Sequence, residues 1–372
     1  MAASKVYFTD MRVSGNETVP GKMIRLAKKA GLDQMDFEGK FVAIKVHFGE
    51  EGNLAFLRPD YARALVEYIK SRGGKPFVSD SSTLYVGARK NALDHLDVAF
   101  KHGYNPFQLG CHTIIADGVK GTDEAIVEID GEYVKHAKIG RAFVDADVII
   151  SLNHFKGHEG TGFGGALKNL GMGCGSSAGK AEMHEDEKPT ANPEKCVGCG
   201  VCARNCAHDA VEMVDKKAHV NYDKCKGCGR CIGVCPTGAM KPSAENGTEL
   251  LSRRVSEYAY AVCKDRPCFH ISLICDVSPN CDCHSENDIP IIPNVGMLAS
   301  FDPVALDQAC ADLCNKQPVM QGSVLAENIA KGLEFEKHEH FHMTHPDTDW
   351  ESCLRHAEEI GLGTRSYELV KI

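Results

Sequence analysis

The sequence lacks the features that mark membrane-spanning, exported and nucleic-acid-binding proteins. None of the apolar runs in its 372 residues approaches the roughly 18 residues of a membrane-spanning helix. Its start, MAASKVYFTD, lacks the apolar core of a signal peptide. The formal net charge of −9 disfavours binding to a nucleic acid. We therefore expect a cytoplasmic protein whose partners include neither a membrane nor a nucleic acid.

Two nucleotide-binding fingerprints are missing as well. The phosphate-binding loop G-x-x-x-x-G-K-[ST] is absent from the sequence. The segment GTGFGG lacks the spacing and the acidic residue that a dinucleotide-binding site requires. The sequence therefore gives no indication of a flavin or nicotinamide cofactor.

Cysteine, by contrast, is abundant, with 18 residues. A disulfide scaffold would be a short exported chain, whereas this chain is long and spaces its cysteines as metal ligands are spaced. The motifs CVGCGVCARNC and CKGCGRCIGVCP both read C-x2-C-x2-C-x3-C. They contribute Cys196, Cys199, Cys202, Cys206, Cys225, Cys228, Cys231 and Cys235 as candidate metal ligands.

This spacing is typical of bacterial ferredoxins that hold two 4Fe–4S clusters, in which the fourth cysteine of each run ligates the other cluster. We expect Cys235 to complete the cluster of the first run, and Cys206 to complete the cluster of the second. Zinc is the alternative, but a zinc site stops at four ligands. Residues 191–243 resemble a two-cluster ferredoxin throughout, although Ala207 stands where ferredoxins usually have proline.

Outside this segment, strand and helix patterns alternate along the chain. The alternation predicts an α/β body, with a mostly parallel sheet and helices on its faces, that carries a small α+β ferredoxin-like insert. We expect the first part of the body at 1–190, the ferredoxin domain at 191–243 and the second part of the body at 244–372. The polar residues 178–195 are predicted to be a linker.

Two short stretches, KVHFGEEGN and NHFKGHEGT, share a pattern, and each follows a predicted buried strand. In open α/β sheets, ligands bind at the carboxyl ends of the strands. A third strand ends at VSDSST. We therefore expect polar side chains from these three places to converge on one rim, namely Lys45, His47, Glu51, Asp80, His154, Lys156 and His158. The alternative is that they are solvated loop residues.

The second of these stretches opens HFKGHEGTGFGGALKNLGMGCGSSAGK, which has nine glycines and three lysines. We interpret it as a glycine-rich loop that leads into a short helix, whose amides would hold a phosphate or a carboxylate. The alternative is a surface loop without a ligand. The predicted binding residues are Gly162, Gly164, Gly165, Lys156 and Lys180, and the predicted catalytic residues are Lys45, His47, Asp80, Lys168, His154 and His158, with the last two as proton carriers.

A further motif, CDCHSENDIP, places Cys281 and Cys283 on either side of an aspartate and is followed by His284. Two thiolates at this spacing can bind one metal ion or form a redox pair. The alternative is that they are ordinary buried or loop thiols. We therefore keep a further metal at Cys281 and Cys283 as a hypothesis.

Three motifs, NHFKGHEGTGFGGALKNLGMGCGS, CDCHSENDIPIIPNVGMLAS and DPVALDQA, resemble the family called domain of unknown function 362, the iron–sulfur-centre proteins of bacteria and archaea. The resemblance covers nearly the whole chain and implies its architecture, not its substrate. The loop GFGGALK is also similar to a loop of the nickel-pincer lactate racemase family, with matches at Gly162, Phe163, Gly165 and Lys168, while Gly164 replaces a serine.

Three functions remain compatible with these observations. The leading hypothesis is an oxidoreductase in which two 4Fe–4S clusters pass electrons to or from a small anionic substrate in the α/β body, with a second protein as redox partner. The first alternative is a non-catalytic electron carrier or maturation protein that docks on an enzyme. The second is a non-redox isomerase in which the clusters are structural.

Overall fold

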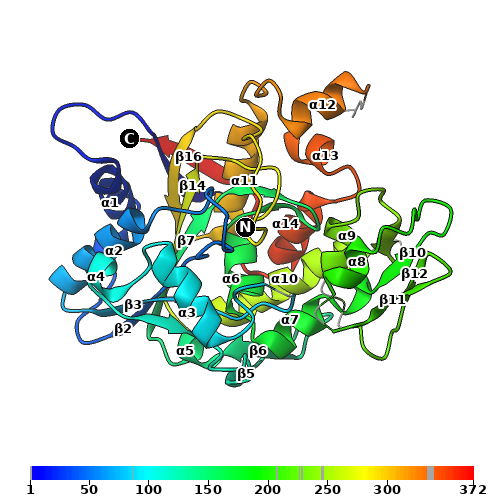
Figure 1. Ribbon diagram of the computed structural model, residues 1–372. Coiled ribbons are helices and arrows are strands. Elements are labelled where there is room, and N and C mark those ends of the chain that lie inside the picture. The colour runs from blue at the N-terminus through cyan, green and yellow to red at the C-terminus, as the bar shows by residue number, and fades with distance from the viewer. Residues whose placement is uncertain are drawn as a thin grey trace.

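The computed structural model describes residues 2–85, 87–206, 208–225, 227, 229–243, 247–332 and 339–372. In this part of the chain a central sheet carries helices on both faces (Figure 1). Its strands run in the order β16-β1-β15-β14-β7-β2-β3-β4. Their bounds are β1 (Ser4–Asp10), β2 (Phe41–Lys45), β3 (Lys75–Asp80), β4 (Thr113–Ile115), β7 (Val148–His154), β14 (Cys268–Ile274), β15 (Gly296–Ser300) and β16 (Tyr367–Lys371).

The sheet is mostly parallel, because only β15 runs antiparallel to its two neighbours, β1 and β14. The strands β14, β7, β2, β3 and β4 form a continuous parallel block. Their carboxyl ends therefore lie at one edge of the sheet, where Lys45, Asp80 and His154 are the last residues of β2, β3 and β7. The predicted α/β class with a mostly parallel sheet is confirmed.

Two apolar cores fill the space between the sheet and its helices, one on each face. Along β2, Val42 and Ile44 face one core and Ala43 faces the other, as the two-residue repeat of a strand requires. Since both faces are covered, β2 and β7 read as nearly continuous apolar runs. The core that Val42 and Ile44 face is covered by helices that include α1 (Val19–Lys29), α2 (Pro59–Ser71), α3 (Ala92–Lys101) and α4 (Pro106–Leu109). The core that Ala43 faces is covered by helices that include α6 (Ala166–Cys174), α10 (Gly247–Cys263), α11 (Pro303–Asn315) and α14 (Trp350–Glu359).

Shorter elements connect these layers. They are η1 (Leu32–Gln34), β5 (Glu124–Glu128), β6 (His136–Gly140), α5 (Arg141–Val144), β8 (Lys156–His158), β9 (Gly162–Gly164), α7 (Ser177–Met183), η2 (Glu185–Glu187), α12 (Val324–Ala330) and α13 (His340–Thr344). The strands β5 and β6 form a hairpin around Asp130 and Gly131, and β8 and β9 form a second hairpin just before α6.

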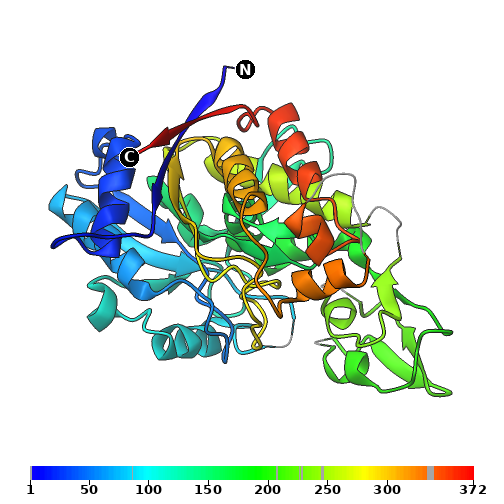
Figure 2. The ribbon, with the colours of Figure 1, turned by 90° about the horizontal axis from the view of Figure 1, so that it is seen from above.

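The segment between β10 (Pro189–Ala191) and β13 (Met240–Pro242) forms a small lobe beside the body (Figure 2). These two strands pair antiparallel, so the chain enters and leaves the lobe at the same place. The lobe also contains α8 (Val201–Arg204), α9 (Arg230–Gly233) and the hairpin of β11 (Val211–Val214) and β12 (Lys217–Val220). It has an apolar cluster of its own, which includes Cys202 and Cys231. The division into domains at 191 and 243 stays a prediction.

The linker predicted at 178–195 needs a correction, because its first part belongs to the body. Residues 177–183 form α7, which begins after Ser176, whose side chain accepts a hydrogen bond from the Gly179 amide. Lys180 and Met183 are buried, and α7 contacts β6 and α10. Because this stretch is mostly polar, the sequence did not predict the helix, which has one buried side.

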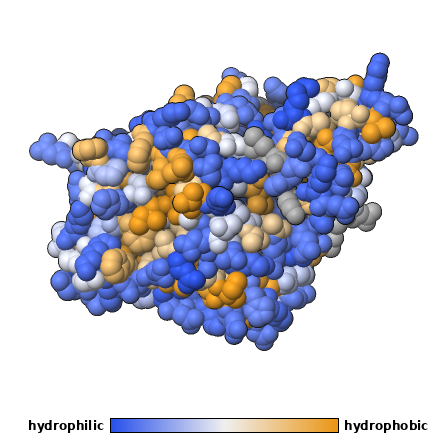
Figure 3. All heavy atoms as spheres, turned by 60° about the horizontal axis from the view of Figure 1, so that its bottom comes forward, coloured by the Kyte–Doolittle hydropathy of each residue, from blue (hydrophilic) through white to orange (hydrophobic). Residues whose placement is uncertain are grey.

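The surface is mostly hydrophilic on the face shown in Figure 3, with smaller apolar patches between the polar side chains. Within the described residues, no helix is both long enough and apolar enough to cross a membrane.

Candidate functional site

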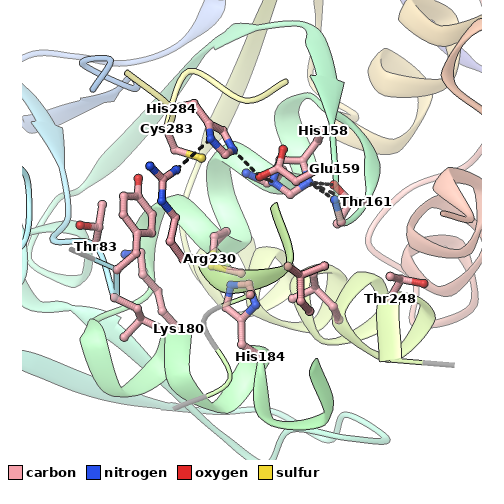
Figure 4. A pocket seen from close by; sticks show the side chains of 18 of the residues that line it. Thr83, His158, Glu159, Thr161, Lys180, His184, Arg230, Thr248, Cys283 and His284 are labelled. Carbon is pink, nitrogen blue, oxygen red and sulfur yellow. Dashed lines mark hydrogen bonds and ion pairs between the residues drawn. The ribbon is translucent and has the colours of Figure 1, made fainter. Parts of the chain in front are cut away.

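A cavity of about 680 Å³ lies at the edge of the sheet where β2, β3 and β7 end (Figure 4). One wall comes from the body and the other from the lobe, which contributes residues such as Lys195, Arg230 and Met240. The structure thus brings together most of the residues predicted from sequence, and those that line this cavity are Lys45, His47, Asp80, His154, Lys156, His158, Lys168, Lys180, Cys283 and His284.

Asp80 is the centre of a buried charge network. Its carboxylate lies 3.0 Å from the Lys45 ammonium and 3.5 Å from the Arg89 guanidinium. Burial alone would raise the pKa of Asp80, but Lys45, followed by His47, His95 and Arg89, holds it well below the ordinary value. Asp80 is therefore ionised, and Lys45 and Arg89 are already paired inside the protein.

Lys180 is a different kind of cavity cation. Its ammonium donates hydrogen bonds to the Ser81 hydroxyl and the Gly175 carbonyl. Among the described residues, no carboxylate lies within ion-pair distance of it. Burial lowers the pKa of Lys180 to about 8, although Asp117 and Asp80 oppose this shift. Its charge is thus the least compensated of the buried lysines, and a bound anion would stabilise it.

His154 is held between two acceptors. Its Nδ1 lies 2.8 Å from Asp282 Oδ2, and its Nε2 lies 2.8 Å from the Cys275 carbonyl oxygen. Both ring nitrogens are therefore engaged within the protein. His154 positions the Asp282 carboxylate, from which Lys156 Nζ is 3.6 Å away, and its role as a proton carrier stays a prediction.

His158 and His47 present a ring nitrogen to backbone amides. His158 Nδ1 accepts hydrogen bonds from the amides of Gly160 and Thr161, both at 3.0 Å, so it carries no proton. His47 Nδ1 accepts from the Gly49 amide at 3.0 Å, and burial lowers the pKa of His47 well below its ordinary value. In both rings the exchangeable proton is therefore on Nε2, and the proton-carrier role of His158 stays a prediction.

A hydrogen-bonded chain joins the lobe to the body across the cavity. Arg230 is the first residue of α9, within the second cysteine run, and it donates to His284 Nδ1 at 2.9 Å. His284 Nε2 in turn lies 2.7 Å from Glu159 Oε1 (Figure 4). Burial and the Arg230 guanidinium oppose a charge on His284, whereas Glu159 raises its pKa. Because Nδ1 accepts from Arg230, the ring carries its proton on Nε2, which faces Glu159.

Glu159, Cys283 and His284 place one ligand atom each within 4.8 Å of one another, which is close enough to hold a metal ion. Cys281 is outside this group, and a metal shared by Cys281 and Cys283 stays a hypothesis. A metal on His284 Nε2 would leave the proton on Nδ1, which faces the Arg230 guanidinium. The geometry therefore favours the hydrogen-bonded chain over a metal ion.

The backbone amides that follow the glycine-rich loop bind a carboxylate of the protein itself. The amides of Ala166 and Leu167, at the start of α6, donate to the Asp307 carboxylate at 2.7 and 2.9 Å. A Cβ at Gly165 would lie 2.3 Å from an Asp307 oxygen, and a Cβ at Gly162 would lie 2.7 Å from the Trp350 side chain. Since these amides already hold a carboxylate, the prediction that they bind an external anion is corrected.

Gly162, Gly164 and Gly165 are therefore absent from the cavity wall formed by the described residues. Gly164 lies close to the Lys156 and Lys168 side chains, 3.4 and 3.3 Å from where its Cβ would be. Its small size leaves room for those lysines, and the lysines, not the amides, provide the cavity's positive charge.

The predicted Glu51 does not reach the cavity either. It is half exposed and pairs with Lys101 at the surface. Its neighbour Glu50 is buried instead, and its carboxylate accepts from the Ala88 amide at 2.7 Å and from Arg89 at 3.1 Å. Sequence reasoning missed Glu50 and Arg89 because a shift of one residue in a loop reverses which side chain is buried.

The cysteines of the lobe gather around α8 and α9, and those that the structure describes form no disulfide. Cys228 lies outside the described residues. Burial raises the pKa of Cys202, and the nearby thiols of Cys235 and Cys196 add to the shift, so the end of the second run lies close to the first run. Three backbone amides donate to cysteine sulfurs, those of Ala210 to Cys206 at 3.2 Å, Gly227 to Cys225 at 3.5 Å and Met240 to Cys235 at 3.5 Å.

Comparisons with known proteins match parts of the chain. The model of the family described as Domain of unknown function (DUF362) matches residues 42–312. A curated relative, the thylakoid-associated protein sll1697 of Synechocystis sp., is 28% identical over 148 residues, which are 38% of this chain and 40% of that protein.

Two solved structures are also similar. A protein from Thermotoga maritima has a TM-score of 0.45 and 13% identity, covering 82% of this chain and 61% of that chain. The lactate racemase apoprotein from Thermoanaerobacterium thermosaccharolyticum has a TM-score of 0.37 and 11% identity, covering 73% of this chain and 51% of that chain. The match spans less than two thirds of each of these three proteins.

Proposed function

The chain belongs to the DUF362 family, and we propose that it is an iron–sulfur oxidoreductase that transfers electrons between two 4Fe–4S clusters in the lobe and an anionic substrate in the cavity of the body. The observation that carries the proposal is the position of the cavity, which has the body on one side and the cysteine-rich lobe on the other. Electron transfer falls off steeply with distance, so a substrate in this cavity would lie beside the electron source.

The lobe has the chemistry that such clusters need. Its described cysteines form no disulfide, and Cys235 approaches Cys202 and Cys196 of the other run, as crossed ligation requires. Gly198, Gly200, Gly227 and Gly229 have φ between 69° and 73°, where glycine is favoured, and they allow the tight turns between cysteines. When bound, the clusters would supply one-electron transfer.

The body supplies the charge and the proton chemistry. Lys180 and Lys168 are cavity cations without a carboxylate partner among the described residues, and a small carboxylate or phosphate complements them. His158 carries its exchangeable proton on Nε2 and lines the same cavity. These groups would hold the anion and exchange a proton with it.

A simple electron carrier would not require such a cavity. Burying a charge costs free energy unless the charge is paired, and unpaired buried charges are common at functional sites. This cavity has several buried charges at the ends of the parallel strands. The isomerase alternative predicts the same anion but no effect of cluster oxidation state on its binding.

Acetate should stabilise the protein against heat below pH 8 and should lose this effect as the pH rises through about 8. The reason is that acetate complements the Lys180 ammonium, whose buried pKa is about 8, and the neutral amine above that pH offers no charge. At about ten times the dissociation constant, acetate should raise the unfolding temperature by about 2 °C. Differential scanning fluorimetry over a pH series measures the effect.

The matched control replaces an exposed lysine. Lys180→Met should abolish both the acetate effect and its pH dependence, whereas Lys5→Met, on the exposed side of β1, should respond as the parent does. If acetate, lactate and phosphate all fail to stabilise the parent, or if Lys180→Met responds like the parent, the cavity does not bind such anions through Lys180.

A further inference from the structure

The motif Cys281–Asp282–Cys283–His284 forms a turn that the body clamps from several sides. The turn is closed by a hydrogen bond from the His284 amide to the Cys281 carbonyl at 3.0 Å. The Glu50 amide donates to the Asp282 carbonyl at 2.8 Å, and the Asn53 side chain donates to the His284 carbonyl at 3.0 Å. The Asp282 carboxylate is held by His154. The backbone between the two cysteines is therefore fixed.

Within this turn the two sulfurs interact directly. The Cys283 thiol donates a hydrogen bond to Cys281, and it lowers the pKa of Cys281 well below its ordinary value. Burial opposes this shift, and Lys168, with Nζ 3.5 Å from the Cys281 sulfur, adds to it. The same contact raises the pKa of Cys283. The two thiols therefore differ in acidity, as do the members of a pair that attack and resolve disulfides.

The two cysteines differ in their access to the cavity. Cys281 is 1% exposed and Cys283 is partly exposed in the cavity wall. Cys283 also lies beside His284, which Arg230 connects to the lobe. The pair therefore lies between the place proposed for the substrate and the lobe that would carry electrons.

We propose that Cys281 and Cys283 form a redox-active pair that cycles between the dithiol and a disulfide, a role that rests on the electron-transfer function proposed above. Oxidation forms one S–S bond, breaks the S–H bonds of Cys281 and Cys283, and releases two electrons and two protons. The electrons pass singly to two one-electron acceptors, the class to which the proposed clusters belong, and the protons leave into the cavity. Reduction reverses each of these changes.

The test is an anaerobic redox titration of the intact protein with reduced and oxidised dithiothreitol. Each sample is quenched in acid, alkylated under denaturing conditions and digested. The mass of the peptide that contains both cysteines is then measured by mass spectrometry. We expect that peptide to convert reversibly from two alkylated thiols to one disulfide, with a single midpoint. Cys283→Ser should show no reversible conversion, and Cys275→Ser, a nearby buried thiol whose pKa burial raises to about 12, should titrate as the parent does.

The inference is overturned if both thiols remain free under the most oxidising conditions of the titration. It is also overturned if a bound zinc ion protects the two thiols and is released in Cys283→Ser. The iron content of the same samples separates this failure from that of the proposed function. About eight irons per chain without a disulfide would remove the redox pair alone. A disulfide in protein that holds no iron would support the pair and remove the cluster-based function.

Discussion

Asp80→Asn should lower the free energy of unfolding by about 3–5 kcal/mol, the cost of leaving buried charges without their partner. Asparagine keeps an oxygen for the Ser81 amide, which lies 2.9 Å from Oδ1. It removes the charge that faces Lys45 at 3.0 Å and Arg89 at 3.5 Å, and both of these cations stay buried. Urea unfolding followed by circular dichroism measures the loss, which corresponds to about 4–6 °C in the unfolding temperature.

The pH dependence of this loss provides a second readout. The folded pKa of Asp80 lies well below its ordinary value, so Asp80 contributes stability above the unfolded pKa of about 4 and loses it as the pH falls further. The difference between parent and Asp80→Asn should therefore shrink below about pH 4. Asp130→Asn, which breaks an exposed pair with Lys135, should leave the unfolding free energy unchanged within error. Equal effects at the two aspartates would refute the buried network.

Cys235→Ser should reduce the iron content of anaerobically prepared protein from about eight towards about four irons per chain. Although Cys235 closes the second run, it lies near Cys202 and Cys196 of the first. The cluster that it completes should therefore be the one held by the first run. Iron analysis and electron paramagnetic resonance of the reduced protein measure what remains.

Cys206→Ser provides the reciprocal test, because Cys206 should complete the cluster of the second run. Each single variant should keep the spectrum of a different cluster, and the double variant should lose both. Cys111→Ser, which changes a buried thiol in the body, should keep all of the iron. Identical residual spectra in the two single variants would contradict crossed ligation.

Much of the fold could be predicted from local patterns. Buried parallel strands such as β2 and β7 read as apolar runs, and α11 shows its start in Asp302, whose side chain accepts from the amides of Val304 and Ala305. The antiparallel direction of β15 could not be predicted, because its five residues are buried like those of the parallel strand β7 and nothing local records direction. The helix α7 was missed because polar residues surround its few buried positions.

The candidate site was predictable where a strand places a residue, and not where a distant segment completes the contact. Lys45, Asp80 and His154 end their strands, so the rule for parallel sheets placed them correctly. Asp307 lies far along the chain from the α6 amides that it binds, and Arg230 comes from the lobe. Such pairings depend on the folded topology, and no periodicity in the sequence encodes them.

The most direct test of the account is the iron and acid-labile sulfide content of protein purified without air. The proposed function predicts about eight irons and about eight sulfides per chain, from two 4Fe–4S clusters. About four irons, or zinc in place of iron, would contradict it.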